Sequence, residues 1–176
     1  MKRLAGILPL FVAAQLVQGF AVQGAQAEVP AFKKVVVILF ENTDYERAMA
    51  QPTFARLAAA GGQLTQMVAV AHPSQPNYLA LIAGSTFGQL HDGILDLPGR
   101  HLGDLLEESG KSWKAYAEGY PGNCFRKATF GAYARRHVPF LSFTNVTLNP
   151  ARCARVVGAA EFFEDFRAGT LPDFSF

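Results

Sequence analysis

Apolar and polar residues follow different periods along the chain, and these periods predict its secondary structure. Residues 34–40 (KVVVILF) form a continuous apolar and β-branched run, which is typical of a strand buried on both faces of a parallel sheet. A second run at 63–70 predicts another strand, and the alternation at 112–118 predicts a third. The segments between these strands are long enough to hold helices.

Segments with helical composition or periodicity separate the expected strands. Helices are expected at 52–60, 76–83, 101–109 and 160–168, and a further element is expected to begin within 171–176. In the last helix, Phe162, Phe163 and Phe166 are expected to form the buried face. Strands that alternate with helices predict an α/β fold with a mostly parallel central sheet.

The first residues of the chain have the order of a secretory signal. Two basic residues precede an apolar run that ends near position 22, and Ala25-Gln26-Ala27 follows as a small-x-small cleavage site. This order predicts a signal peptide at 1–27 and one domain at 28–176. The alternative is a membrane-spanning helix, which the glutamines within the run and the lack of a basic cluster after it disfavour. We therefore expect a periplasmic or secreted protein with no stable membrane span after cleavage.

The charge of the chain excludes one class of partner. The predicted signal contains two of the 16 basic residues and none of the 14 acidic ones, so the predicted domain has 14 of each. No basic run or arginine-rich helix is present. We therefore expect no nucleic-acid partner and no attraction to an anionic membrane. The sequence does not indicate an oligomeric state.

Cys124 and Cys153 are the two cysteines of the chain. In the oxidising compartment predicted above, an even pair favours one disulfide, and two buried free thiols are the alternative. A disulfide closing this loop would contribute about 3–4 kcal/mol in the chain-entropy model. No further cysteine or histidine lies at ligand spacing beside either residue, so metal binding by the pair is not expected.

Two polar clusters follow the first two expected strands. Glu41 and Asn42 come directly after 34–40, and a cluster at 72–77 follows 63–70. In parallel sheets, ligands bind beyond the carboxyl ends of the strands, so both clusters lie where a site is expected. Carboxylate and amide oxygens are hard ligands that suit a divalent cation, although such residues are also common in turns.

Ser74 lies between Pro73 and Pro76 in the second cluster. A serine hydroxyl needs activation before it can act as a nucleophile. No GxSxG motif is present, so activation by a metal ion is the available route. The N–H groups at the start of the next helix would face an anion, and the Asn77 amide could donate to a phosphate oxygen. Capping of that helix is the alternative role of Ser74, and the two roles are compatible.

Several stretches together resemble one family. FENTDYERAM and AHPSQPNYLALIAGSTFG resemble the bacterial and fungal acid phosphatase/phosphoesterase family, which includes phospholipase C-type enzymes and belongs to the alkaline phosphatase superfamily. HLGDLLEESGKSWKAYAEGYPGNCF, RRHVPFLSFTNV and GTLPDFSF are similar to it too. The resemblance implies an alkaline phosphatase-like sheet flanked by helices. It also implies an exported phosphoesterase, most specifically an acid phosphatase acting on phosphate monoesters, with a phospholipase C-type phosphodiesterase as the alternative.

The resemblance implies roles for particular residues. Glu41 and Asn42 would bind a divalent metal ion, whose identity the sequence leaves open. Ser74 would be the nucleophile that forms a phosphoserine and would then also be a metal ligand. The substrate would be a phosphorylated small molecule or a phospholipid head group. Its candidate contacts are Asn77, His72 and His137, and for each histidine a structural, hydrogen-bonded role is the alternative.

The sequence departs from the family pattern after Cys153. Family members continue beyond the position of Phe176 with an Asp/His-rich segment that supplies the remaining metal ligands. Here that part of the sequence holds four carboxylates and no histidine: Glu161, Glu164, Asp165 and Asp173. We therefore expect the N-terminal portion of such a domain. A truncated, catalytically inactive secreted domain is the hypothesis of another class.

Overall fold

A computed structural model describes residues 31–176, so the signal peptide predicted at 1–27 lies outside the described residues. Residues Phe32–Phe176 group into one unit by their contacts. None of the described helices has the length and apolar character needed to cross a membrane.

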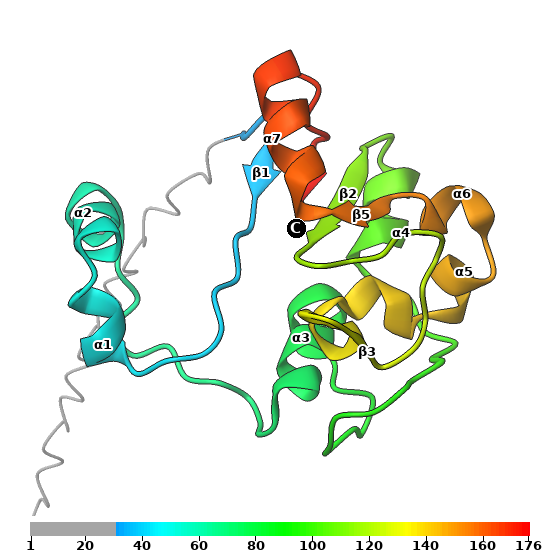
Figure 1. Ribbon diagram of the computed structural model, residues 1–176, viewed down its shortest axis with the longest axis horizontal. Coiled ribbons are helices and arrows are strands. Elements are labelled where there is room, and N and C mark those ends of the chain that lie inside the picture. The colour runs from blue at the N-terminus through cyan, green and yellow to red at the C-terminus, as the bar shows by residue number, and fades with distance from the viewer. Residues whose placement is uncertain (1–30) are drawn as a thin grey trace, which may run out of the picture. The chain divides into compact units, whose positions relative to one another are not determined.

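A parallel sheet is the centre of this unit (Figure 1). Its four strands, in the order β1-β6-β2-β5, are β1 (Val35–Val36), β6 (Phe174–Ser175), β2 (Trp113–Ala117) and β5 (Val156–Gly158). Phe174 pairs with Val35 on one side and with Trp113 on the other, and β2 pairs with β5 from Ala115 to Ala117. All these pairings are parallel, which confirms the predicted α/β fold.

Helices and a small hairpin complete the described structure. The α-helices are α1 (Tyr45–Met49), α2 (Pro52–Ala60), α3 (Ser74–Ala83), α4 (Leu102–Glu108), α5 (Thr144–Thr147), α6 (Pro150–Cys153) and α7 (Ala159–Ala168). Two 3₁₀ helices, η1 (Arg135–His137) and η2 (Pro139–Ser142), follow an antiparallel hairpin of β3 (Thr129–Phe130) and β4 (Tyr133–Ala134). The predicted helices at 52–60, 76–83, 101–109 and 160–168 correspond to α2, α3, α4 and α7.

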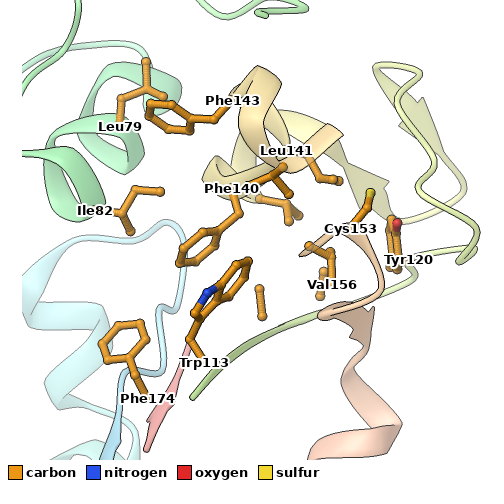
Figure 2. Packing of buried hydrophobic residues seen from close by; sticks show 14 of the residues in the cluster. Leu79, Ile82, Trp113, Tyr120, Phe140, Leu141, Phe143, Cys153, Val156 and Phe174 are labelled. Carbon is orange, nitrogen blue, oxygen red and sulfur yellow. The ribbon is translucent and has the colours of Figure 1, made fainter. Parts of the chain in front are cut away.

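Successive side chains of strand β2 point to opposite faces of the sheet, so β2 shows what covers each face. Trp113 and Ala115 are buried in the core, where the ring of Trp113 stacks on Phe140 with centroids 4.4 Å apart (Figure 2). On the other face, Lys114 forms ion pairs with α7, and Tyr116 packs edge-on against Phe162 of that helix. Helices therefore cover both faces of the sheet.

The aromatic core ties α3 to the sheet. Leu79 and Ile82 of α3 point toward Phe140 of η2 and Phe143, and all four side chains are buried (Figure 2). The predicted disulfide between Cys124 and Cys153 is present in the structure. It joins the segment after β2 to the end of α6, so the part of the chain that supports α3 is also held covalently.

Two of the expected strands differ from the structure. Only Val35 and Val36 of the run at 34–40 pair with another strand, and most of the run is exposed rather than buried. The strand predicted at 63–70 is wrong, because this segment is turn and irregular backbone and all its residues are exposed. A strand forms only where a neighbour pairs with its N–H and C=O groups, and no described segment pairs with 63–70.

The buried face expected for α7 is also partly wrong. Phe163 is 57% exposed and Phe166 is 65% exposed, while Phe162 is half-buried against Tyr116. Helical periodicity showed which residues share a face, but not how much of that face another element covers.

Candidate active site

Ser74 is the first residue of α3, but its hydroxyl does not cap that helix. The N-cap position is Pro73, and the carboxylate of Asp92 accepts the free N–H of Gln75 at 2.9 Å instead. Gln75 is buried and accepts a hydrogen bond from the N–H of Gly93 at 2.6 Å. The 92–93 segment therefore fixes the start of α3 and leaves the Ser74 hydroxyl available for another partner.

That partner is Glu41, the carboxylate of the first polar cluster. Ser74 donates a hydrogen bond from Oγ to Glu41 Oε1, and Tyr78 donates one to Glu41 Oε2 at 2.6 Å. Residues four positions apart lie on the same face of a helix, so α3 presents both hydroxyls to one carboxylate. The structure thus brings together the two clusters that the sequence singled out, across 33 residues of chain.

The surroundings of Glu41 keep it ionised. Burial acts to raise the pKa of its carboxyl, but the hydrogen bonds from Ser74 and Tyr78 lower it. Nearby His137 and Arg136 lower it further, so the pKa of Glu41 lies below its ordinary value of 4.5. Burial and the bond to Glu41 raise the pKa of Tyr78, so its phenol remains a donor. The site therefore holds one negative charge facing two hydroxyl groups at neutral pH.

His137 approaches the same carboxylate from η1. Its Nε2 lies 3.1 Å from Glu41 Oε1, and its ring stacks on Tyr78 with centroids 5.2 Å apart. The approach is outside hydrogen-bonding geometry, so this buried nitrogen has no hydrogen-bond partner among the described residues. Buried polar atoms are normally satisfied, and a bound group at Glu41 and Ser74 would supply the missing partner.

Asn77 holds the loop that leads into Ser74. Its Oδ1 accepts from the N–H groups of Val70 and Ala71 at 2.9 and 3.1 Å, and its Nδ2 donates to the carbonyls of Ala71 and Pro73 at 2.8 and 3.1 Å. The predicted contact of Asn77 with phosphate stays a prediction. What the amide does in the structure is to fix the backbone before the serine, a role that the sequence did not show.

Asn42 and His72 are both exposed, and their side chains make no hydrogen bond or ion pair within the described part of the chain. Their predicted roles, in metal and substrate binding respectively, therefore stay predictions.

The donor set fits a hard divalent cation in kind. The Glu41 carboxylate and the Ser74 hydroxyl face each other, and Asn42 is adjacent in sequence. Within residues 31–176, no group of three or more His, Cys, Asp and Glu side chains is placed to hold a metal ion. The described residues therefore supply part of a coordination sphere, and Glu41 is its charged member.

Three neighbours of the site were not predicted from the sequence. Tyr78 could have been found, because it lies four residues after Ser74 on a predicted helix. Asp92 gave no signal, and neither did Arg136, whose Nε lies 3.4 Å from Asp92 Oδ2. Asp92 lies in an irregular segment and Arg136 in η1, and only the tertiary fold brings them to the start of α3.

A cavity of about 620 Å³ opens beside Glu41. Glu41, Tyr78 and His137 lie among its lining residues, and most of the remaining lining is apolar or aromatic. A second cavity, of about 490 Å³, lies at the disulfide and has none of these side chains. The first cavity is therefore the one that reaches Glu41, the hydrogen-bond partner of Ser74.

The fold and the site define an α/β protein with a serine at a helix start that faces a carboxylate beyond the end of a parallel strand. Residues 47–176 match the model of the Phosphoesterase family, and the chain belongs to this family. The resemblance seen in the sequence is thus confirmed.

Relatives among known proteins carry phosphatase names. A probable acid phosphatase from Kluyveromyces lactis is 35% identical over 161 residues, which cover 86% of this chain and 38% of that protein. The phosphate-repressible acid phosphatase of Penicillium chrysogenum is 35% identical over 153 residues, covering 83% and 37%. The phosphatidylinositol-3-phosphatase of Mycobacterium tuberculosis is 36% identical over 131 residues, covering 69% and 42%. The chain spans about two fifths of the length of the curated relatives it matches.

Proposed function

We propose that the protein is an exported, metal-dependent phosphoric ester hydrolase, most specifically an acid phosphatase that hydrolyses phosphate monoesters. The observation that carries this proposal is the hydrogen bond from Ser74 to Glu41 at the start of α3. Membership of the phosphoesterase family and the names of the relatives support the reaction class. Export to the periplasm or the medium rests on the signal sequence at 1–27 alone.

In the proposed mechanism, Ser74 Oγ attacks phosphorus, the ester P–O bond breaks, and the alcohol leaves. Water then attacks the phosphoserine, which restores the hydroxyl and releases phosphate. Glu41 Oε1, which accepts the hydrogen bond from Ser74, would take the serine proton and pass it on to the leaving oxygen, so that the alcohol leaves neutral. A divalent cation bound by Glu41, Asn42 and Ser74 would stabilise the serine alkoxide and neutralise phosphate charge.

Other residues of the site would bind and orient the substrate. The unsatisfied Nε2 of His137 is available to a phosphate oxygen or to the leaving oxygen. Asn77 fixes the loop before Ser74, which keeps the nucleophile in one place during the attack. His72 is exposed in the same loop and remains a candidate contact of the substrate.

A phospholipase C-type phosphodiesterase is the second candidate. The apolar lining of the cavity beside Glu41 favours a substrate with a large apolar alcohol, such as a lipid. Rates with p-nitrophenyl phosphate and with p-nitrophenylphosphorylcholine, measured side by side, distinguish the two. A monoesterase is at least about 10-fold faster on the first, by the ordinary scale of pocket discrimination.

Hydrolysis of p-nitrophenyl phosphate, with Mg²⁺ or Mn²⁺ added, tests the proposed chemistry. Ser74→Ala is expected to lower kcat by at least about 10³-fold, because the nucleophile is lost. Ser109→Ala is the matched control, since Ser109 is exposed at the end of α4 and lies outside the site. Equal activity in wild type and Ser74→Ala would remove Ser74 from the mechanism.

A further inference from the structure

One carboxylate at the site receives two hydroxyl donors from one helix. Ser74 occupies Glu41 Oε1, and Tyr78 occupies Oε2 at 2.6 Å. The two oxygens of Glu41 are therefore not equivalent: one faces the serine and His137, and the other faces the phenol. Because Ser74 and Tyr78 are four residues apart, α3 sets this difference by its own geometry.

The Tyr78 phenol is held rigidly. The residue is only 6% exposed, and its ring stacks on His137 and lies edge-on to Phe176, with centroids 5.2 and 6.5 Å away. A buried tyrosine hydroxyl needs a hydrogen-bond partner, and here that partner is the one carboxylate that also faces Ser74. The ring position thus fixes where Glu41 Oε2 lies, and so the direction in which Oε1 points.

The position of Glu41 makes this support necessary. The carboxylate follows the irregular end of the run at 34–40, whose last residues are exposed and do not belong to a strand. Backbone pairing therefore does not orient the Glu41 side chain. Its orientation comes from the side chains around it, and Tyr78 is the buried one that donates to it at hydrogen-bonding distance.

We propose that Tyr78 is a positioning residue that holds Glu41 Oε2, so that Oε1 is the oxygen that Glu41 presents to Ser74 and would offer to a divalent cation. Tyr78 itself touches neither the substrate nor the reacting atoms. The proposal rests on the function proposed above.

The test measures binding of Mg²⁺ and of Mn²⁺ alone, without substrate, by calorimetry and by the rise in melting temperature. Tyr78→Phe keeps the ring and removes the hydroxyl, and it is expected to weaken metal binding about 10–100-fold, as loss of an outer hydrogen bond to a ligand does. In turnover of p-nitrophenyl phosphate, kcat should fall with KM nearly unchanged, and added metal should restore part of the rate.

Tyr116→Phe is the matched control. The Tyr116 hydroxyl donates to Asp165 at 2.7 Å, a bond of the same kind between a strand and α7 that does not involve Glu41. This variant is expected to bind metal as wild type does. Equal loss in both variants would show a general effect on stability and overturn the proposal.

The other outcomes are also decisive. The proposal would be overturned if Tyr78→Phe had the same metal affinity and kcat as the wild type. It would also be overturned if Tyr78→Phe no longer melted cooperatively, because the hydroxyl would then be needed for folding. A wild-type chain that binds neither ion would overturn it too. Ser74→Ala is assayed in parallel so that failure of the Tyr78 proposal can be told apart from failure of the proposed function. Only full activity in Ser74→Ala would exclude the phosphoserine mechanism.

Discussion

Asp92 fixes the start of the helix that carries Ser74, and its removal should be measurable in both stability and rate. Its Oδ1 accepts the N–H of Gln75 at 2.9 Å, and its Oδ2 lies 3.4 Å from Arg136 Nε. The first contact is equivalent to an N-cap, whose loss costs about 1–2 kcal/mol. The second is a partly exposed ion pair, worth about 0–1 kcal/mol.

Asp92→Ala should therefore lower the melting temperature by about 2–12 °C, because a loss of about 1–3 kcal/mol is expected and each kcal/mol corresponds to about 2–4 °C in a domain of this size. Asp92→Asn retains an oxygen that can accept the Gln75 N–H, so it should lose less than about 1 kcal/mol. Glu164→Ala, at an exposed position of α7, is the control and should melt as wild type does.

Asp92→Ala should reduce kcat strongly even though it lowers the free energy of unfolding only modestly. A frayed first turn of α3 displaces Ser74, and misplacement of a reacting group by about 1 Å can cost up to about 100-fold. Asp92→Ala should therefore reduce kcat for p-nitrophenyl phosphate by about 10–100-fold at a temperature where the chain remains folded. Thermal unfolding followed by circular dichroism and initial rates are the two assays. Identical melting of Asp92→Ala and wild type, or equal losses in Ala and Asn, would refute the role of Asp92 as a cap.

Two further predictions concern the fold around the site. Replacing Cys124 and Cys153 together by serine opens a loop of 29 residues and should cost about 3–4 kcal/mol in urea unfolding; an unchanged midpoint would contradict this. Burial raises the pKa values of Asp104 and Glu107, but hydrogen bonds, including those from Arg152, outweigh burial and hold both pKa values below their ordinary 3.8 and 4.5, while burial lowers the pKa of His101 below 6.5. The two carboxylate shifts stabilise the fold above the ordinary pKa values and are lost as pH falls, and the His101 shift destabilises the fold below pH 6.5, where the unfolded histidine gains a proton that the folded one resists. The urea midpoint should therefore decrease from pH 7 to pH 3.5, and a midpoint that rises on acidification would contradict this.

The elements that the sequence predicted correctly depend on local information. The helices at 52–60 and 101–109 contain good helix formers and end at glycine or a short polar segment, and the alternation at 112–118 places Trp113 in the core and Lys114 on the other face. These signals act within a few residues, so they predict local structure correctly without knowledge of the rest of the fold.

The elements that were wrong depend on partners far away in the sequence. The run at 63–70 has the composition of a strand, but pairing requires a neighbour, and no described segment provides one. The same reasoning explains the exposure of Phe163 and Phe166, whose shared face was clear from the helical period while its covering was not.

The candidate site shows both cases. The juxtaposition of Glu41 and Ser74 was expected from two polar clusters near strand ends, and the structure joins them by a hydrogen bond. The hydrogen bonds from the Asn77 side chain to the preceding loop and the cap from Asp92 were not foreseen, because their partners are backbone groups that only the folded chain brings close. Side-chain chemistry was therefore easier to predict than the contacts that hold it in place.

Acid quenching during turnover, followed by mass spectrometry of the peptide that contains Ser74, detects whether this serine carries the phosphate. With p-nitrophenyl phosphate and a divalent ion present, we expect a phosphate group on Ser74 that is absent from Ser74→Ala. Steady hydrolysis without phosphate on that peptide, or with phosphate on a different residue, would contradict it.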